Sequence, residues 1–321
     1  MKSDQLKQIT IGKLRGLQQC TSPRGTFTCL ALDHRQNLRK SNPNFVNDAE
    51  LSRFKLDVLS VLAKHSTAIL LDPEVSAAQA VAKGVIPRQV GLVVAVESTG
   101  YRGTSIARQS QILPGWSVEK VKRMGASMVK LLVYYHPDSV SAPEVEKFVK
   151  KVVADCEHYD LGIMLEPLSY SLDFDKKLSS AEKNYVVIET ARRLVTTGVD
   201  VLKVEFPLEI SEEHDENNWR LACAKISSTS SAPWILLSAA VNFDVYLRQV
   251  EIACRAGASG IAVGRAVWQE AVHLDGKARL EFLRTTSRER LAKLAALCSD
   301  FGRPVNDFFR SDVPFDWYKK Y

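Results

Sequence analysis

The sequence lacks several features that would assign it to a common class of protein. Its 321 residues contain no run of eighteen apolar residues, so we predict no membrane span. The start of the chain mixes basic and polar residues and has no apolar core typical of a secretion signal. The net charge of +6 is too small to indicate a nucleic-acid partner, although it mildly favours anionic small molecules.

Cysteine and histidine are few and scattered. The six cysteines form no CxxC pair, which argues against a disulfide framework and favours a reducing compartment, so we expect a cytoplasmic protein. The six histidines form no HxH, HxxxH or HExxH pattern, and we therefore predict neither a metal site nor another cofactor.

Short apolar runs recur along the chain, each four to seven residues long and continuous, as is typical of strands buried on both faces. They cover residues 26–32, 67–71, 91–96, 128–133, 162–165, 201–204, 234–237 and 260–263. Helical patterns separate them, with capping signals such as Asn242 and the capping boxes at 141–144 and 179–182. This alternation predicts an α/β fold, a (β/α)8 TIM barrel. A doubly wound open sheet is the alternative, but no GxGxxG follows the first strand.

No linker-like stretch divides the chain, so we expect a single barrel domain over residues 1–321. An arm over about residues 1–25 would precede the barrel and fray, and a helical tail over about 280–321 would follow it. The sequence does not fix the oligomeric state, but barrels of this type often associate, and we expect a homo-oligomer.

The residues that follow the apolar runs differ sharply from the runs themselves. Asp33, His34 and Arg35 follow the first run, and Glu166 follows the fifth. In a barrel the carboxyl ends of the strands meet at one face, where the chemistry takes place. Any one acid after a strand can simply cap the next helix, but the set as a whole points to an active site.

Two lysines lie within apolar runs. Because side chains alternate along a strand, Lys203 shares a face with Val201, and Lys130 shares one with Met128, which places both lysines inside the barrel. Burial and a second ammonium group would lower a lysine pKa and yield the neutral amine that forms a Schiff base. Alternatively, each lysine neutralises a nearby acid such as Glu205 or Glu166.

Glu166 is expected at the mouth of the barrel, where it could transfer protons during imine formation. Burial would raise its pKa and the lysines would lower it. Glu166 could equally be the counter-ion of Lys130 or Lys203, and the two roles are compatible.

Two further strand ends suggest a phosphate site. Small residues let backbone N–H groups approach an anion, a helix N-terminus adds a favourable dipole, and an arginine adds a bidentate charge. The residues of this predicted site are Ser238, Ala239, Ala240, Gly264 and Arg265.

Taken together, these segments resemble the class I tagatose 1,6-bisphosphate aldolase family. The likeness runs from about residue 26 to 271 and is carried by residues 31–35, 68–74, 97–101, 129–135, 199–205, 237–241 and 264–266. The resemblance implies a (β/α)8 fold and metal-free cleavage of a ketose 1,6-bisphosphate to dihydroxyacetone phosphate and glyceraldehyde 3-phosphate. We expect tagatose 1,6-bisphosphate as the substrate, with fructose 1,6-bisphosphate left open because the two epimers differ only at one hydroxyl.

The resemblance also implies roles for individual residues. Lys203 would form the Schiff base, Glu166 would transfer protons, and Lys130 would be a further active-site lysine. Ser238 and Arg265 would hold the C1 phosphate. Asp33, His34 and Arg35 would face the other end of the substrate.

The chain departs from the family pattern at three places. Ala240 stands where glycine is usual, His34 stands where glutamine is usual, and the loop after Glu166 is shorter. Residues 233–268 also resemble sulfofructosephosphate aldolases, which would give sulfolactaldehyde beside dihydroxyacetone phosphate. A third possibility is a sugar-phosphate sensor without catalysis, which would have no use for a buried nucleophilic lysine.

Overall fold

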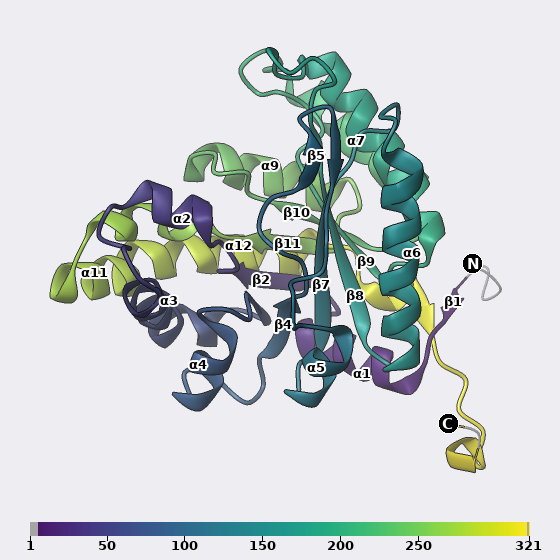
Figure 1. Ribbon diagram of the computed structural model, residues 1–321, viewed down its shortest axis with the longest axis horizontal. Coiled ribbons are helices and arrows are strands. Elements are labelled where there is room, and N and C mark those ends of the chain that lie inside the picture. The colour runs from purple at the N-terminus through teal and green to yellow at the C-terminus, as the bar shows by residue number, and fades with distance from the viewer. Residues whose placement is uncertain (1–5, 320) are drawn as a thin grey trace.

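The computed structural model describes residues 6–319 and residue 321. Eight parallel strands within them close into a barrel, in chain order around the ring (Figure 1). They are β2 (Phe27–Ala31), β3 (Ala68–Leu71), β4 (Gly91–Ala95), β7 (Met128–Tyr134), β8 (Gly162–Leu168), β9 (Val201–Val204), β10 (Trp234–Leu237) and β11 (Gly260–Val263). The closed ring confirms the (β/α)8 prediction and excludes the open doubly wound sheet.

Each predicted apolar run matches one barrel strand to within one residue at either end, except at the end of β8. Strand β8 continues three residues further, to Leu168, because its pairing with β7 extends to Leu168 opposite Tyr134. Glu166 therefore lies within a strand and not after one. A strand fixes a side chain more firmly than a loop does, so the Glu166 carboxylate has a better-defined position than the sequence predicted.

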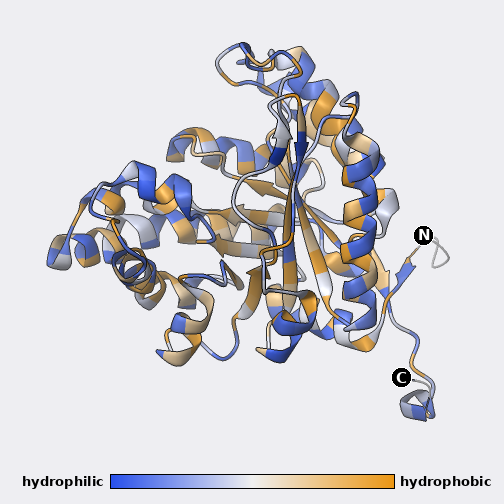
Figure 2. Ribbon diagram, viewed as in Figure 1, coloured by the Kyte–Doolittle hydropathy of each residue, from blue (hydrophilic) through white to orange (hydrophobic). Residues whose placement is uncertain are grey.

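The helices surround the barrel and present their polar faces outward, while the strands form an apolar centre (Figure 2). They are α1 (Ile11–Cys20), α2 (Gln36–Ser41), α3 (Asp48–Leu62), α4 (Ala77–Ala82), α5 (Val118–Arg123), α6 (Ala142–His158), α7 (Ser180–Leu194), α8 (Glu216–Thr229), α9 (Phe243–Arg255), α10 (Arg265–Trp268), α11 (Gly276–Phe282) and α12 (Arg288–Phe301). Among the described residues, no helix has the length and apolar character needed to cross a bilayer.

Shorter elements complete the chain. Two small sheets pair β1 (Lys7–Gln8) with β12 (Phe309–Arg310) and β5 (Arg102–Thr104) with β6 (Ala107–Gln109). One π-helical turn, η5 (Leu283–Ser287), joins α11 to α12. The 3-10 turns are η2 (Ala63–His65), η3 (Val195–Thr197), η4 (Gln269–His273), η6 (Val305–Asp307) and η7 (Trp317–Lys319).

The core has two layers, as side-chain alternation along the strands predicts. Met128 and Val201 belong to the cluster inside the barrel. Val129, Leu202 and Val204 belong to the larger cluster between the strands and the helices. Lys130 and Lys203 thus share the inward face of their strands, as expected.

The helix-capping predictions have different outcomes. The Asn242 side chain caps α9, and the capping box of Ser179 and Glu182 is formed at α7. The box predicted at Ser141 is wrong, because its backbone is already helical and its side chain makes no cap hydrogen bond. The Ser141 hydroxyl instead contacts the Arg108 carbonyl at 3.3 Å, across the loops above the barrel.

The N-terminal segment differs from the expected frayed arm. Residues 1–5 lie outside the described residues, but residues 11–20 form α1, which packs against β4, β7 and β8. Leu17 and Cys20 are fully buried there. The helix carries few apolar residues in sequence, and Lys13 is buried by pairing with Asp200 at 3.0 Å and Glu157 at 2.6 Å.

This buried ion pair gives a stability prediction. We expect Lys13→Met to lower the free energy of unfolding by roughly 3 kcal/mol, because it leaves the carboxylate of the fully buried Asp200 short of a partner. Lys7 also contacts Asp200 at 3.0 Å, but its side chain is 38% exposed, so Lys7→Met should cost about 1 kcal/mol or less. Urea unfolding of both variants measures the difference. An equal loss of unfolding free energy in the two variants would contradict the conclusion that Lys13 is the main partner of Asp200.

The C-terminal tail is helical only in its first half. Helix α12 ends at Phe301, where Gly302 is extended and Pro304 follows. Beyond it the described residues form the 3-10 turns η6 and η7 and the strand β12, which pairs with β1. The prediction of a helical tail to the end of the chain is therefore wrong after Phe301.

Candidate active site

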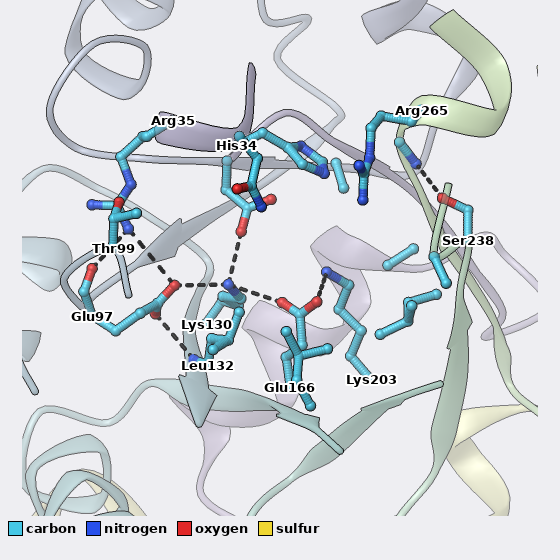
Figure 3. A pocket seen from close by; sticks show the side chains of 18 of the residues that line it. His34, Arg35, Glu97, Thr99, Lys130, Leu132, Glu166, Lys203, Ser238 and Arg265 are labelled. Atoms are coloured by element: carbon cyan, nitrogen blue, oxygen red, sulfur yellow. Dashed lines mark hydrogen bonds and ion pairs between the residues drawn. The ribbon is translucent and has the colours of Figure 1, made fainter. Parts of the chain in front are cut away.

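A cavity of about 320 Å³ opens at the carboxyl ends of the barrel strands (Figure 3). Ten of the eleven predicted site residues line it: Asp33, His34, Arg35, Lys130, Glu166, Lys203, Ser238, Ala239, Gly264 and Arg265. Ala240 is exposed and is not part of this lining. The volume lies in the range of small-molecule sites.

Lys203 and Glu166 lie at the centre of the cavity and point toward one another (Figure 3). The Lys203 Nζ is 2.7 Å from Glu166 Oε1. Strands β9 and β8 are neighbours, so barrel closure fixes both side chains from the backbone. Only 5% of Lys203 and 6% of Glu166 is exposed. An amine and a carboxylate in such contact can exchange a proton directly.

Lys130 is surrounded by carboxylates. Its Nζ lies 2.8 Å from Asp33, 2.7 Å from Glu97 and 2.9 Å from Glu166. Burial alone would lower the pKa of Lys130, but the three carboxylates outweigh it and raise that pKa well above its usual value. The expectation of a lowered pKa is therefore wrong for Lys130, whose carboxylate neighbours favour the protonated amine.

The same charges keep the acids ionised. Burial opposes ionisation of Glu166, but Lys130 and Lys203 more than compensate and lower its pKa. Lys130 and Lys203 likewise hold the pKa of the buried Asp33 below its usual range. Glu166 Oε2 is buried and, among the described residues, has no hydrogen-bond partner besides its ion-pair contact with Lys130 at 2.9 Å.

Glu97 stood among the charged residues expected at strand ends, but the sequence analysis gave it no role in the site. It follows β4, lines the cavity, and accepts a hydrogen bond from Leu132 N at 3.1 Å besides its contact with Lys130. Its position directly after an apolar run was the available signal. What the sequence could not supply was its closeness to Lys130 on the neighbouring strand β7.

Arg35 lines the cavity, but protein groups occupy both of its terminal nitrogens. One donates to Glu74 and the other donates to the Glu97 carbonyl at 2.9 Å. Asp72 fixes the loop that carries Glu74 by accepting hydrogen bonds from two backbone N–H groups, and it pairs with Lys55. This arrangement positions Glu97 and leaves Arg35 few donors for a substrate.

His34 lies on the side of the cavity that holds the predicted phosphate residues Gly264 and Arg265 (Figure 3), and not at the opposite end of the substrate as the resemblance implied. Its ring is edge-on to Trp268, at 5.4 Å between centroids. Burial and the nearby Arg265 lower the pKa of His34 to about 4, against the opposing effect of Asp33. Its Nδ1 is buried without a hydrogen-bond partner. The imidazole is therefore neutral near pH 7.

The lowered pKa predicts a pH-dependent stability. The unfolded chain takes up a proton near pH 6.5, whereas folded His34 does so only near pH 4, so stability falls as the pH falls through this window. Between pH 7 and pH 4, we expect the free energy of unfolding of His34→Gln to fall by roughly 1–3 kcal/mol less than that of the wild type. Urea unfolding across this range measures it, and parallel pH profiles would contradict it.

The predicted phosphate residues lie together across the ends of β10 and β11. Gly264 N donates to Ser238 Oγ at 3.4 Å, and Arg265 projects into the cavity (Figure 3). Ala239 and Ala240 adopt left-handed backbone with φ of 41° and 60°, a conformation that glycine adopts without strain. The backbone at Ala240 thus has the conformation that the usual glycine would adopt. Helix α10 has only four residues, so the predicted dipole contribution is small.

Glu205 follows β9 and also lines the cavity, but it does not pair with Lys203. Its Oε2 accepts from Ser169 N at 2.6 Å and Ser169 Oγ at 2.7 Å. Burial raises the pKa of Glu205, and these two hydrogen bonds only partly offset that effect. Glu166, not Glu205, is therefore the acid that faces the lysines. Over the described residues, no group of histidine, cysteine or acidic side chains has the arrangement of a metal site.

Known proteins match this chain in sequence. The DeoC/LacD family of aldolases matches residues 27–270, from the first barrel strand to the turn after α10. The chain is 29% identical to a tagatose 1,6-diphosphate aldolase of Listeria monocytogenes serotype 4a (strain HCC23), over 92% of this chain and 94% of that one. It is 27% identical to the protein of that name from Lactococcus lactis subsp. lactis, over 93% and 99%.

Solved structures share the fold. A fructose-bisphosphate aldolase from Plasmodium falciparum superposes with a TM-score of 0.73 at 13% identity, covering 94% of this chain and 99% of that one. A Schiff-base-forming fructose-1,6-bisphosphate aldolase superposes with a TM-score of 0.56 at 20% identity, covering 85% and 98%.

Proposed function

The chain belongs to the DeoC/LacD family of aldolases, and we propose that it cleaves a ketose 1,6-bisphosphate through a Schiff base on Lys203. Tagatose 1,6-bisphosphate is the proposed substrate, since the curated relatives carry that activity in their names. The products are dihydroxyacetone phosphate and glyceraldehyde 3-phosphate. The observation that carries this proposal is the buried Lys203 amine held 2.7 Å from Glu166 within the cavity.

The first half of the reaction forms the iminium. Glu166 takes a proton from the Lys203 ammonium, and the free amine adds to the C2 carbonyl of the open-chain sugar. A proton moves from nitrogen to oxygen to give a carbinolamine. Glu166 then returns its proton to the departing hydroxyl, so that water leaves and the nitrogen carries the positive charge. Lys130 stays protonated and stabilises the Glu166 carboxylate between these steps.

The second half breaks the C3–C4 bond. A cavity carboxylate accepts the C4 hydroxyl proton, the bonding electrons move to the iminium nitrogen, and glyceraldehyde 3-phosphate leaves. Glu166 is suited to accept that proton because its carboxylate lies 2.7 Å from the Lys203 Nζ, beside the iminium. Protonation of the enamine at C3 and hydrolysis release dihydroxyacetone phosphate and restore the lysine.

The six cysteines are all free and buried, which is consistent with a reducing compartment. We therefore retain the proposal of a cytoplasmic enzyme.

A panel of phosphorylated ketoses tests the proposal: tagatose and fructose 1,6-bisphosphate, and the 6-sulfonated ketose 1-phosphate. Triose phosphate release is followed in a coupled assay. We expect the enzyme to cleave one of the bisphosphates, and we expect added EDTA not to reduce the rate. Cleavage of the sulfonated sugar alone would replace the proposed substrate, and binding without release of any triose would support a sensor.

A further inference from the structure

We propose that Arg108 is the receptor for the anionic group at the distal end of the substrate. The inference rests on the proposed function and identifies the protein group that selects a doubly anionic ketose. Arg108 lies on β6 of the hairpin β5–β6, which extends above the end of β7 (Figure 1).

The barrel geometry defines where the distal anion must lie. The residues proposed for the first phosphate lie at the ends of β10 and β11. Around the ring, β7 is four strands from β11 in either direction, so it lies directly across the barrel. A sugar that starts at Gly264 and reacts at Lys203 therefore extends toward Tyr134, the last residue of β7, which lines the far side of the cavity.

Lys130 and Arg35, two further cations that line the cavity, already have protein partners. Lys130 contacts three carboxylates, and Arg35 donates to Glu74 and to the Glu97 carbonyl. A second anion would have to compete with these partners. Arg108 is different, because within the described part of the chain no carboxylate pairs with it.

Three tyrosines hold the Arg108 guanidinium, and one of them, Tyr134, lines the cavity. Its central carbon lies 4.7 Å from the ring centroid of Tyr101, 4.5 Å from that of Tyr170 and 5.6 Å from that of Tyr134. Stacking on aromatic faces fixes the plane of a guanidinium and leaves its N–H edge free. Toward the residues that the structure describes, Arg108 uses only Nε, as a donor to the Ser105 carbonyl at 2.8 Å. The terminal nitrogens remain able to grip a tetrahedral anion in a bidentate manner.

The hairpin is attached to the barrel, so Arg108 has a defined position. Ser139 Oγ donates to the Ile106 carbonyl at 2.9 Å, and Ser141 Oγ donates to the Arg108 carbonyl at 3.3 Å. Both serines belong to the segment that follows β7. This attachment fixes the guanidinium before the substrate binds, which lowers the entropic cost of recognition.

The bound group is a phosphate or a sulfonate, since both are tetrahedral anions that a guanidinium recognises. Three ketoses separate the possibilities: the 1,6-bisphosphate, the 6-sulfonated 1-phosphate and the 1-phosphate without a distal anion. We expect Arg108→Met to lower kcat/KM about 10- to 100-fold for whichever doubly anionic ketose the wild type cleaves. Its kcat/KM for the 1-phosphate should change less than about threefold, because no charge-assisted contact is lost there.

Arg102→Met on the same hairpin is the matched control, since Arg102 is exposed and lies on β5. It should retain wild-type kinetics with all three sugars. Arg108→Lys keeps the charge but not the bidentate geometry, so its kcat/KM for the doubly anionic ketose should lie between those of Arg108→Met and the wild type. This variant replaces Arg108→Met in the test if Arg108→Met does not fold. If kcat/KM of a folded Arg108 variant changes equally for all three sugars, or does not change, the inference about Arg108 is wrong while the proposed function still stands. A wild type that cleaves no ketose phosphate would refute the proposed function and the inference with it.

Discussion

Lys203→Met is expected to lower kcat by roughly 10⁴- to 10⁶-fold, the range seen when the nucleophile of a covalent mechanism is removed. Methionine fills a similar volume on β9 but has no amine to form an iminium, so the electrons of the C3–C4 bond have no acceptor. Lys130 still contacts Glu166 at 2.9 Å in this variant, so the buried carboxylate keeps a cationic partner and the fold should tolerate the replacement. Steady-state cleavage of the bisphosphate measures the loss.

Borohydride trapping identifies the lysine directly. Reduction in the presence of substrate should add a dihydroxyacetone phosphate remnant to Lys203 in the wild type and none in Lys203→Met. Lys225→Met, on the exposed face of α8, is a control for lysine removal and should behave as the wild type. Activity of Lys203→Met within tenfold of the wild type, or a remnant on Lys130, would refute the assignment.

The sequence was sufficient to predict the barrel because fold and side-chain orientation depend on local patterns. Continuous apolar runs marked the strands, and alternation within residues 201–204 placed Lys203 inside before any contact was known. The closed ring then brings ten predicted residues to one cavity.

Local patterns could not predict which charges touch. The pKa of Lys130 depends on Asp33, Glu97 and Glu166, which come from three separate segments and meet only when the ring closes. The α1 helix was missed for a related reason. Its apolar pattern is weak, and its burial depends on the ion pair of Lys13 with the distant Asp200. Likewise, nothing in the local sequence shows that three tyrosines surround Arg108.

Glu166→Gln is expected to lower kcat by roughly 10²- to 10⁴-fold, the contribution typical of a positioned acid–base group. Glutamine has nearly the same shape and would keep its place between Lys203 and Lys130, but it cannot take a proton from one group and return it to another. Borohydride should still label Lys203 in this variant, only more slowly, because the lysine remains while loss of water lacks its proton donor.

Glu205→Gln provides the matched control, because Glu205 lines the same cavity but bonds to Ser169. Its kcat should stay within about tenfold of the wild type, since no proton-transfer group is removed. The lysines lower the pKa of Glu166, so wild-type activity should persist as the pH falls through 4.5 and decline only below it. An equal loss in both variants would mean that the pairing of Glu166 with Lys203 is electrostatic support alone, with the proton carried by another group.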